Sequence, residues 1–254
     1  MVKKILLVIG IIIVIICGGV GYYIYLMSVQ ENMLKQEIIN YTNKDLINDE
    51  FVVEVKTKGN YAYIEEAIKK YYKKLSINVR KINLYLIDED LEKLMTIDNL
   101  TNDRPKFDKS YKILEDTKTD IDLSISVVKE LCDENYIKNL VSDKIKDKHF
   151  IDLYNSLMYT KSDIQELKDI REDTEELSNN LNLYLDKARE VFNILEKNDR
   201  YWSIDKGSIY ITDENILNEY NKKYQELRDI VNNKLSKYKK RSIGKSNNNS
   251  VISA

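Results

Sequence analysis

The feature that most constrains this chain is an uncharged, apolar run, Ile5–Met27, which directly follows Lys3 and Lys4. At about 1.5 Å of rise per residue, a helix of this length covers the roughly 30 Å hydrocarbon core of a bilayer. The run closes with a group of tyrosines, a residue type that is enriched where a spanning helix meets the headgroups. The sequence therefore predicts a transmembrane helix over residues 5–27.

Two other kinds of N-terminal segment contain a similar run. A cleaved signal peptide usually has an apolar region of about 7–15 residues that ends at a small-x-small site, whereas this run is longer and ends in bulky aromatic residues. A lipid-modified cysteine normally follows a small residue, but Cys17 follows Ile16. A permanent anchor is the favoured interpretation, with the cleaved signal and the lipidated Cys17 as alternatives.

The charges that flank the run predict its orientation. Lys3 and Lys4 precede it, while the following segment, Ser28–Gln36, carries Glu31 and Lys35 and has no net positive charge. Positive residues favour the cytoplasmic side of a span. We expect residues 1–4 to be a cytoplasmic tail and the C-terminal part of a single-pass membrane protein to lie outside the cell membrane.

The composition of the remaining chain predicts a mainly α fold. Glycine occurs seven times and proline once, as Pro105, which disfavours all-β folds built on tight turns. We expect an elongated extracytoplasmic helical bundle over residues 60–241, with a small β-hairpin before the last helix. Residues 28–59 are expected to form a stalk or linker in which Phe51–Val55 is an edge strand, and the Ser/Asn-rich residues 242–254 to form a disordered tail.

Apolar residues recur at steps of three or four in four segments, which is the period of an amphipathic helix. The first stripe consists of Ile64, Ile68, Tyr71, Leu75, Val79, Ile82 and Leu86. The second helix is expected from Phe107 to Leu131, with Asp103 as its cap and Pro105 in its first turn. The third is expected to be one long helix from about Phe150 to Leu195, in which a heptad spacing indicates a coiled coil or a long bundle helix.

The hairpin is predicted from two alternating runs, Tyr201–Ile204 and Ser208–Ile211, which flank a turn that contains Gly207. Thr212 or Asp213 is expected to cap the final helix. The apolar stripe of that helix consists of Ile216, Tyr220, Tyr224, Leu227, Val231, Leu235 and Tyr238.

Aromatic residues on the hairpin are the first candidate binding surface. Tyr201, Trp202 and Tyr210 cluster there, and rigid aromatic side chains can stack on sugars or contact a protein partner. The same hairpin can instead be a lid that closes the end of the bundle. The lid is favoured, because Trp202 and Ile204 alternate towards one face while Tyr201 and Ser203 alternate towards the other.

A basic C-terminal segment is the second candidate. No acidic residue follows Asp229, whereas six cations do: Lys234, Lys237, Lys239, Lys240, Arg241 and Lys245. Such a cluster can bind anionic lipid headgroups or wall polyanions, or it can simply be a solubilising helix end. The rest of the exposed chain is acidic, so nucleic acid is not an expected partner.

The sequence contains no recognisable catalytic or metal-binding pattern. His149 is the single histidine, no Gly-x-Ser-x-Gly turn presents a serine, and no calcium-loop pattern is found. Paired carboxylates such as Glu172 and Glu176 could in principle serve a wall-glycan hydrolase, but a solvated helix face is the favoured interpretation. We expect neither enzymatic activity nor a cofactor nor a metal site.

The hairpin followed by Asn218-Glu219-Tyr220-Asn221 resembles the C-terminal end of a bacterial family of membrane-tethered, often lipoprotein-type, helical envelope proteins of unknown function. The layout is similar from Phe107 to Leu227. The resemblance implies an extracytoplasmic helical domain and no catalytic residues. Ile16 before Cys17 departs from the lipoprotein form of the family.

These observations predict an interaction or structural component of the bacterial cell envelope, held in the lipid bilayer by its N-terminal helix and bound to an envelope protein or a wall polymer. The alternative is a sensory or ligand-binding ectodomain. Because only residues 1–4 are expected in the cytoplasm, such an ectodomain would signal through a partner membrane protein.

Overall fold

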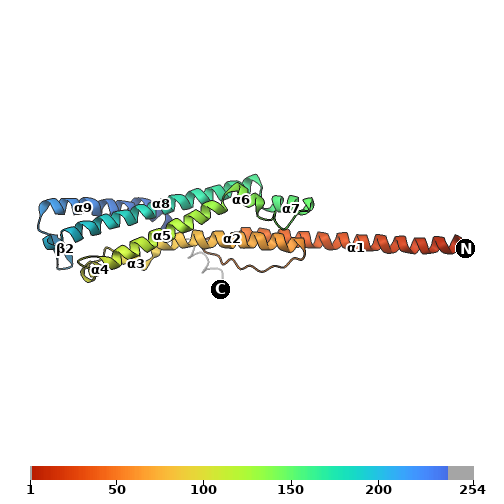
Figure 1. Ribbon diagram of the computed structural model, residues 1–254, viewed down its shortest axis with the longest axis horizontal. Coiled ribbons are helices and arrows are strands. Elements are labelled where there is room, and N and C mark those ends of the chain that lie inside the picture. Colours follow the sequence, from red (N-terminus) through yellow and green to blue (C-terminus); the bar gives the residue numbers. More distant parts are fainter. Residues whose placement is uncertain (1, 240–254) are drawn as a thin grey trace, which may run out of the picture. The chain divides into compact units, whose positions relative to one another are not determined.

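Helices make up most of the computed structural model, which describes the backbone of residues 2–239 and the side chains of residues 19–239 (Figure 1). A two-stranded antiparallel hairpin precedes the last helix, as the sequence predicts. The chain divides into two compact units. Unit 1 contains the residues up to Lys44, Phe51–Lys73 and Ile137–Asp163, and unit 2 contains Asp45–Glu50, Lys74–Tyr136 and the residues from Ile164 onward.

Unit 1 is built on α1 (Val2–Thr42), the first part of α2 (Asn60–Leu84) and α7 (Lys148–Met158). Helices α1 and α2 lie side by side, joined by a hydrogen bond from the Tyr41 hydroxyl to the carbonyl oxygen of Lys69. Leu34, Ile38 and Tyr41 of α1 are buried in this unit. Residues 28–59 were expected to be a stalk or linker, but the structure includes several of them in the core of unit 1.

The predicted edge strand at Phe51–Val55 is wrong. The segment is extended but is not part of a sheet. Phe51 is buried, with its ring edge-on to Tyr41 at 5.2 Å between centroids. The N–H groups of Lys56 and Thr57 donate to the Glu65 carboxylate on α2. A helix side chain thus supplies the acceptor that a neighbouring strand would otherwise provide.

Unit 2 is a helical bundle in which the longer helices are antiparallel neighbours. It contains α5 (Asp108–Leu131), most of α8 (Lys161–Lys197), α9 (Glu214–Asp229), and the short helices α3 (Glu89–Lys93) and α4 (Ile97–Asn102). The division between the units falls within α6 (Glu134–Asn139). The start of α5 contacts the end of α8, where the Tyr111 hydroxyl donates to the Glu196 carboxylate at 2.9 Å, and the end of α5 contacts the earlier part of α8, where Lys129 pairs with Glu175 at 3.6 Å. Helices α8 and α9 are likewise antiparallel, with Lys187 beside Glu226 at 2.9 Å.

The predicted stripe of the first bundle helix is confirmed. It lies on α2 and on η1 (Tyr85–Ile87), a short 3₁₀ segment, and all seven of its side chains are buried. The boundary before the second helix differs from the prediction. Helix α5 begins at Asp108, so Pro105 precedes the helix instead of occupying its first turn. Asp103 still caps it, because its carboxylate accepts hydrogen bonds from the N–H groups of Lys109 and Ser110.

The single long helix predicted from Phe150 to Leu195 is two helices, α7 and α8. They are separated at Thr160, whose hydroxyl accepts from the N–H of Asp163 while the Asp163 carboxylate accepts from the N–H of Thr160. This reciprocal capping box starts α8, while α7 ends at Met158 with Tyr159 as its C-cap. The expected stripe within α8 is confirmed from Thr174 to Leu195, where most of its side chains are buried.

The hairpin pairs β1 (Trp202–Asp205) with β2 (Ser208–Ile211) after η2 (Asp199–Tyr201), a 3₁₀ turn. Lys206 and Gly207 have φ values of 48° and 75°, the positive values that a tight primed turn requires. Asp213 caps α9 by accepting from the N–H groups of Asn215 and Ile216.

The last helix changes its winding halfway. A π-helical segment, η3 (Ile230–Leu235), follows α9 directly. Ile230 and Leu235 are both buried although they are five positions apart, whereas Val231, which the α period assigns to the core, is 41% exposed. The wider π turn accommodates the extra residue and keeps both side chains on one face.

No helix in the part of the chain with described side chains is long and apolar enough to cross a membrane. The predicted span over residues 5–27 lies mostly outside that part, since side chains are described only from Gly19 onward.

Candidate functional site

Trp202 closes the core of unit 2 at the hairpin. Its side chain is 3% exposed, and its indole N–H donates to the carbonyl oxygen of Leu195 at 2.8 Å. The Arg104 guanidinium lies over the ring, 4.2 Å from the centroid, and Phe107 is stacked at 6.3 Å. Trp202 therefore has the role that the lid interpretation assigns to it and is not available on the surface.

Tyr201 and Tyr210 are both on the surface, where they are 50% and 60% exposed. Tyr210 pairs with Ser203 across the ladder, so its ring lies on the face of the hairpin opposite Trp202. Tyr201 is the last residue of η2, directly before β1. A partner contact through these two tyrosines stays a prediction.

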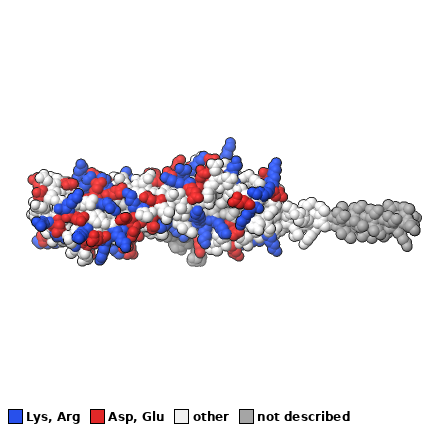
Figure 2. Space-filling model, viewed as in Figure 1, with Lys and Arg blue, Asp and Glu red and all other residues white. Residues whose placement is uncertain are grey.

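The predicted basic segment is largely neutralised where the structure describes it. Lys237 pairs with Glu176 of α8 and Lys239 pairs with Glu92 of α3, each at 2.5 Å. Lys234 is exposed, and Lys240, Arg241 and Lys245 lie outside the described residues. On the face drawn in Figure 2, positive and negative side chains are intermixed. The use of this segment as an anionic-surface contact stays a prediction, and within residues 234–239 the ion pairs weaken it.

His149 lies in the first turn of α7, where its half-exposed side chain is 3.7 Å from the Glu31 carboxylate. Within residues 19–239, no group of three or more His, Cys, Asp or Glu side chains is placed to hold a metal ion. Cys132 is buried, and burial raises the pKa of its thiol to about 12.

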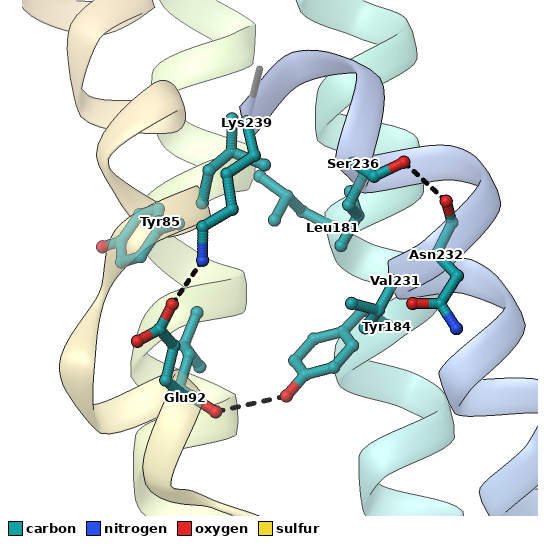
Figure 3. A pocket seen from close by; sticks show the side chains of 11 residues that line it. Tyr85, Glu92, Leu181, Tyr184, Val231, Asn232, Ser236 and Lys239 are labelled. Carbon is teal, nitrogen blue, oxygen red and sulfur yellow. Dashed lines mark hydrogen bonds and ion pairs between the residues drawn. The ribbon is translucent and has the colours of Figure 1, made fainter. Parts of the chain in front are cut away.

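A cavity of about 330 Å³ lies in unit 2 between α3, α8 and η3 (Figure 3). Eleven residues line it, and five of them are aliphatic: Leu86, Leu91, Leu181, Val231 and Leu235. The volume falls in the range of about 300–1,000 Å³ that is typical of small-molecule sites. Ligand pockets of this kind combine apolar walls with a few polar groups that orient the ligand.

The polar groups of the cavity lie around its apolar floor. Glu92 and Lys239 form their ion pair across one side, and both side chains are about half exposed. The Tyr184 hydroxyl donates to the carbonyl oxygen of Leu91 at 3.2 Å. Burial raises the pKa of Tyr184 to about 12, so its hydroxyl stays protonated at neutral pH. The Ser236 hydroxyl donates to the backbone oxygen of Asn232.

The sequence analysis did not predict this cavity, although the spacing of apolar residues in the final helix indicates the π turn on one side of it. In the final helix, Leu227, Ile230, Leu235 and Tyr238 are buried, and the five-residue step between Ile230 and Leu235 breaks the α period. That step marks a π turn, and π turns occur frequently at functional sites. The contributions of Leu91 and Leu181 depend on tertiary packing and have no local signal.

A buried charge cluster in unit 1 was also missed. Lys69 and Glu65 are 3% and 0% exposed, and the Lys69 ammonium lies 2.6 Å from Glu65 and 3.0 Å from Glu37. Lys69 also donates to the carbonyl oxygen of Glu54 at 2.7 Å. The Glu65 carboxylate accepts from the backbone of Lys56 and from the N–H and hydroxyl of Thr57. We call these groups the Lys69 cluster; it fastens the extended segment to α2.

No known protein family, curated protein or solved structure matches this chain. The resemblance of its C-terminal part to membrane-tethered helical envelope proteins therefore stays a prediction, and the function has to be argued from the described residues.

Proposed function

We propose that this protein is a single-pass membrane protein whose helical units lie outside the cytoplasm, where they act as an interaction or structural component of a bacterial cell envelope. The observation that carries the proposal is the exposed apolar surface of α1. Tyr22, Tyr23, Ile24 and Tyr25 are each more than 60% exposed.

Consecutive residues of a helix are about 100° apart, so these four side chains leave no face of the segment packed against unit 1. No charged residue occurs between Gly19 and Gln30, and this part of α1 is white in Figure 2. A helix that is apolar all around requires an apolar environment, which a membrane or a partner supplies. Tyrosines are suited to the interface between the hydrocarbon core and water.

The charges on both sides of this segment support the proposed orientation. Lys3 and Lys4 precede it in the sequence, and the next charged residue after it is Glu31, which is paired with Lys35 at 2.6 Å. A positive N-terminal flank and a neutral C-terminal flank favour an N-terminus inside the cell. At that location the helical units would meet envelope proteins and wall polymers, which are the partners that we propose.

Membrane fractionation of the full chain tests the anchor. We expect the protein to stay with membranes after alkaline carbonate extraction. Replacing Ile12 and Ile16 by arginine should release it, because each central arginine costs about 2.5–3.5 kcal/mol of insertion free energy. The matched control replaces both residues by leucine. Extraction of the unchanged protein by carbonate would refute the anchor.

Protease treatment of wall-stripped cells tests the orientation separately. External protease should degrade the helical units while a cytoplasmic marker stays intact. Protection of the units until the cells are lysed would place them inside and would refute the extracytoplasmic location without affecting the anchor.

A ligand-binding ectodomain is the second candidate function. The cavity beside η3 favours it, because a lined apolar space of this size is not needed for a purely structural bundle. Both candidate functions share the same location and differ in whether a small molecule binds to unit 2.

A further inference from the structure

We propose that the cavity between α3, α8 and η3 binds a small amphiphilic cation, an ammonium group on an aromatic or branched aliphatic body, with the ammonium at Glu92. The inference goes beyond the membrane role and does not depend on where the protein is located. It rests on the shape of the cavity, on the π turn beside it and on the local charge.

The floor of the cavity can accommodate an apolar body. Leu181 and Leu91 line the cavity but are only 1% and 4% exposed, so the apolar surface open to a ligand comes mainly from Val231, which is 41% exposed. The Tyr184 side chain adds an aromatic ring to this floor, opposite the Glu92–Lys239 pair in Figure 3. Burial of apolar surface against such a floor supplies the main affinity for a small ligand.

The π turn opens the helical wall of the cavity. A π turn contains one residue more than an α turn. In η3 the extra residue moves Val231 out of the core and onto the wall of the cavity, where it is 41% exposed. The N–H of Ser236 accordingly bonds to the carbonyl oxygen of Val231, the i,i+5 bond of a π-helix. Regular α winding would return Val231 to the predicted core stripe.

The charges around Glu92 select a cation over an anion. Helix α3 and its cap contain four acidic residues and one basic residue, Lys93. The acidic residues are Asp88, Glu89, Asp90 and Glu92. Lys93 pairs with Glu89 at 2.7 Å, and the Asp88 carboxylate accepts from the N–H of Leu91. This leaves a net negative field at the side of the cavity to which Glu92 belongs.

Lys239 shows how a ligand ammonium would be held. Its own ammonium lies 2.5 Å from the Glu92 carboxylate at the edge of the cavity, on a side chain that is 43% exposed. A pair this exposed contributes little to stability, so exchange of the Lys239 ammonium for that of a ligand costs little. The neighbouring Lys237 is held by Glu176 and does not take part in the exchange.

Isothermal titration of the full-length, detergent-solubilised protein with 2-phenylethylammonium tests the proposal. Neutral 2-phenylethanol and anionic 3-phenylpropionate serve as matched probes of similar size. We expect the cation to bind most tightly. Glu92→Gln should weaken its binding by about threefold to fivefold, the upper part of the range for a solvent-exposed ion pair, while Glu89→Gln, on the same helix but outside the cavity, should leave it unchanged.

Lys239→Gln is the decisive variant, because it removes the internal competitor of the ligand and should tighten binding of the cation by several-fold. A site for anions would respond in the opposite way and lose affinity. Val231→Phe, which fills the cavity from its exposed wall, should abolish binding; circular dichroism checks that each variant is folded. Absence of binding of the cation at millimolar concentration, preference for the anion, or equal binding by Val231→Phe would overturn the proposal.

Discussion

Replacing Lys69 by methionine tests how strongly the Lys69 cluster stabilises unit 1. The substitution keeps most of the aliphatic stem but removes an ammonium that is bonded to Glu65, Glu37 and the carbonyl oxygen of Glu54. It leaves the fully buried Glu65 carboxylate without its counter-ion. Loss of one partner of a buried pair costs about 3–5 kcal/mol. We expect the lower end of this range, because Glu65 keeps its bonds from Lys56 and Thr57.

The chain contains a matched control one residue away. Lys70 pairs with Glu66 at the same i,i+4 spacing and the same 2.6 Å as Lys69 with Glu65, but the two side chains are 65% and 36% exposed. Lys70→Met should therefore change stability by no more than about 0.5 kcal/mol. The two substitutions differ mainly in burial.

Hydrogen exchange of the full chain, followed by mass spectrometry, gives a local measurement. The N–H groups of Lys56 and Thr57 are bonded to Glu65, so a peptide that covers them reports opening of the cluster. A loss of about 3 kcal/mol corresponds to more than a hundredfold faster exchange in Lys69→Met. Adding Glu65→Gln should recover part of the loss, because it removes the uncompensated charge. Equal exchange in Lys69→Met and Lys70→Met would refute the reasoning.

Three further outcomes are expected. Burial alone would raise the pKa of Glu65, but the hydrogen bonds from Lys69 and Thr57 outweigh it and hold the pKa below its ordinary value. This contribution to the free energy of unfolding should be complete above the unfolded pKa of about 4.3 and should be lost as the pH falls through the lowered pKa. Urea denaturation at pH 7 and pH 3 should therefore show that the unchanged protein loses more stability in acid than Lys69→Met does. Equal losses in the two proteins would contradict the assignment. Cys132 should react with iodoacetamide at pH 8 only after denaturation, because the pKa of its buried thiol is about 12; rapid labelling of the native peptide by mass spectrometry would show that it is accessible. Asp213→Ala should lower the free energy of unfolding by about 1 kcal/mol through loss of the α9 cap, measured by the urea midpoint, and an unchanged midpoint would remove Asp213 from that role.

The helical part of the fold was predictable because burial follows periodicity. The stripe from Ile64 to Leu86 is wholly buried, and the alternation of Trp202 and Ser203 gives their correct faces on the hairpin. The break at Thr160 was also present in the sequence as a capping box, but the apolar pattern on both sides suggested one helix.

The remaining features depend on contacts between residues far apart in the sequence. Glu65–Lys69 and Glu66–Lys70 are the same motif in the sequence, and only the packing of α1 and the extended segment against one side of α2 separates a buried cluster from a solvated pair. The cavity depends in the same way on where α3 meets α8. The π turn beside it is indicated by the five-residue step from Ile230 to Leu235, whereas no local pattern indicates its apolar floor.

The way in which Glu65 holds the extended segment also bears on aggregation. Phe51-Val52-Val53-Glu54-Val55 combines β-branched and aromatic residues, the composition that favours pairing between chains, and Val52 is 54% exposed. The segment is not paired with another strand, because hydrogen bonds hold its backbone in place. The N–H groups of Lys56 and Thr57 donate to the Glu65 carboxylate, and the carbonyl oxygen of Glu54 accepts from the Lys69 ammonium. Side chains that hold an isolated β-prone stretch in this way act as its gatekeepers, and damage to the Lys69 cluster would release a strand able to join those of other copies.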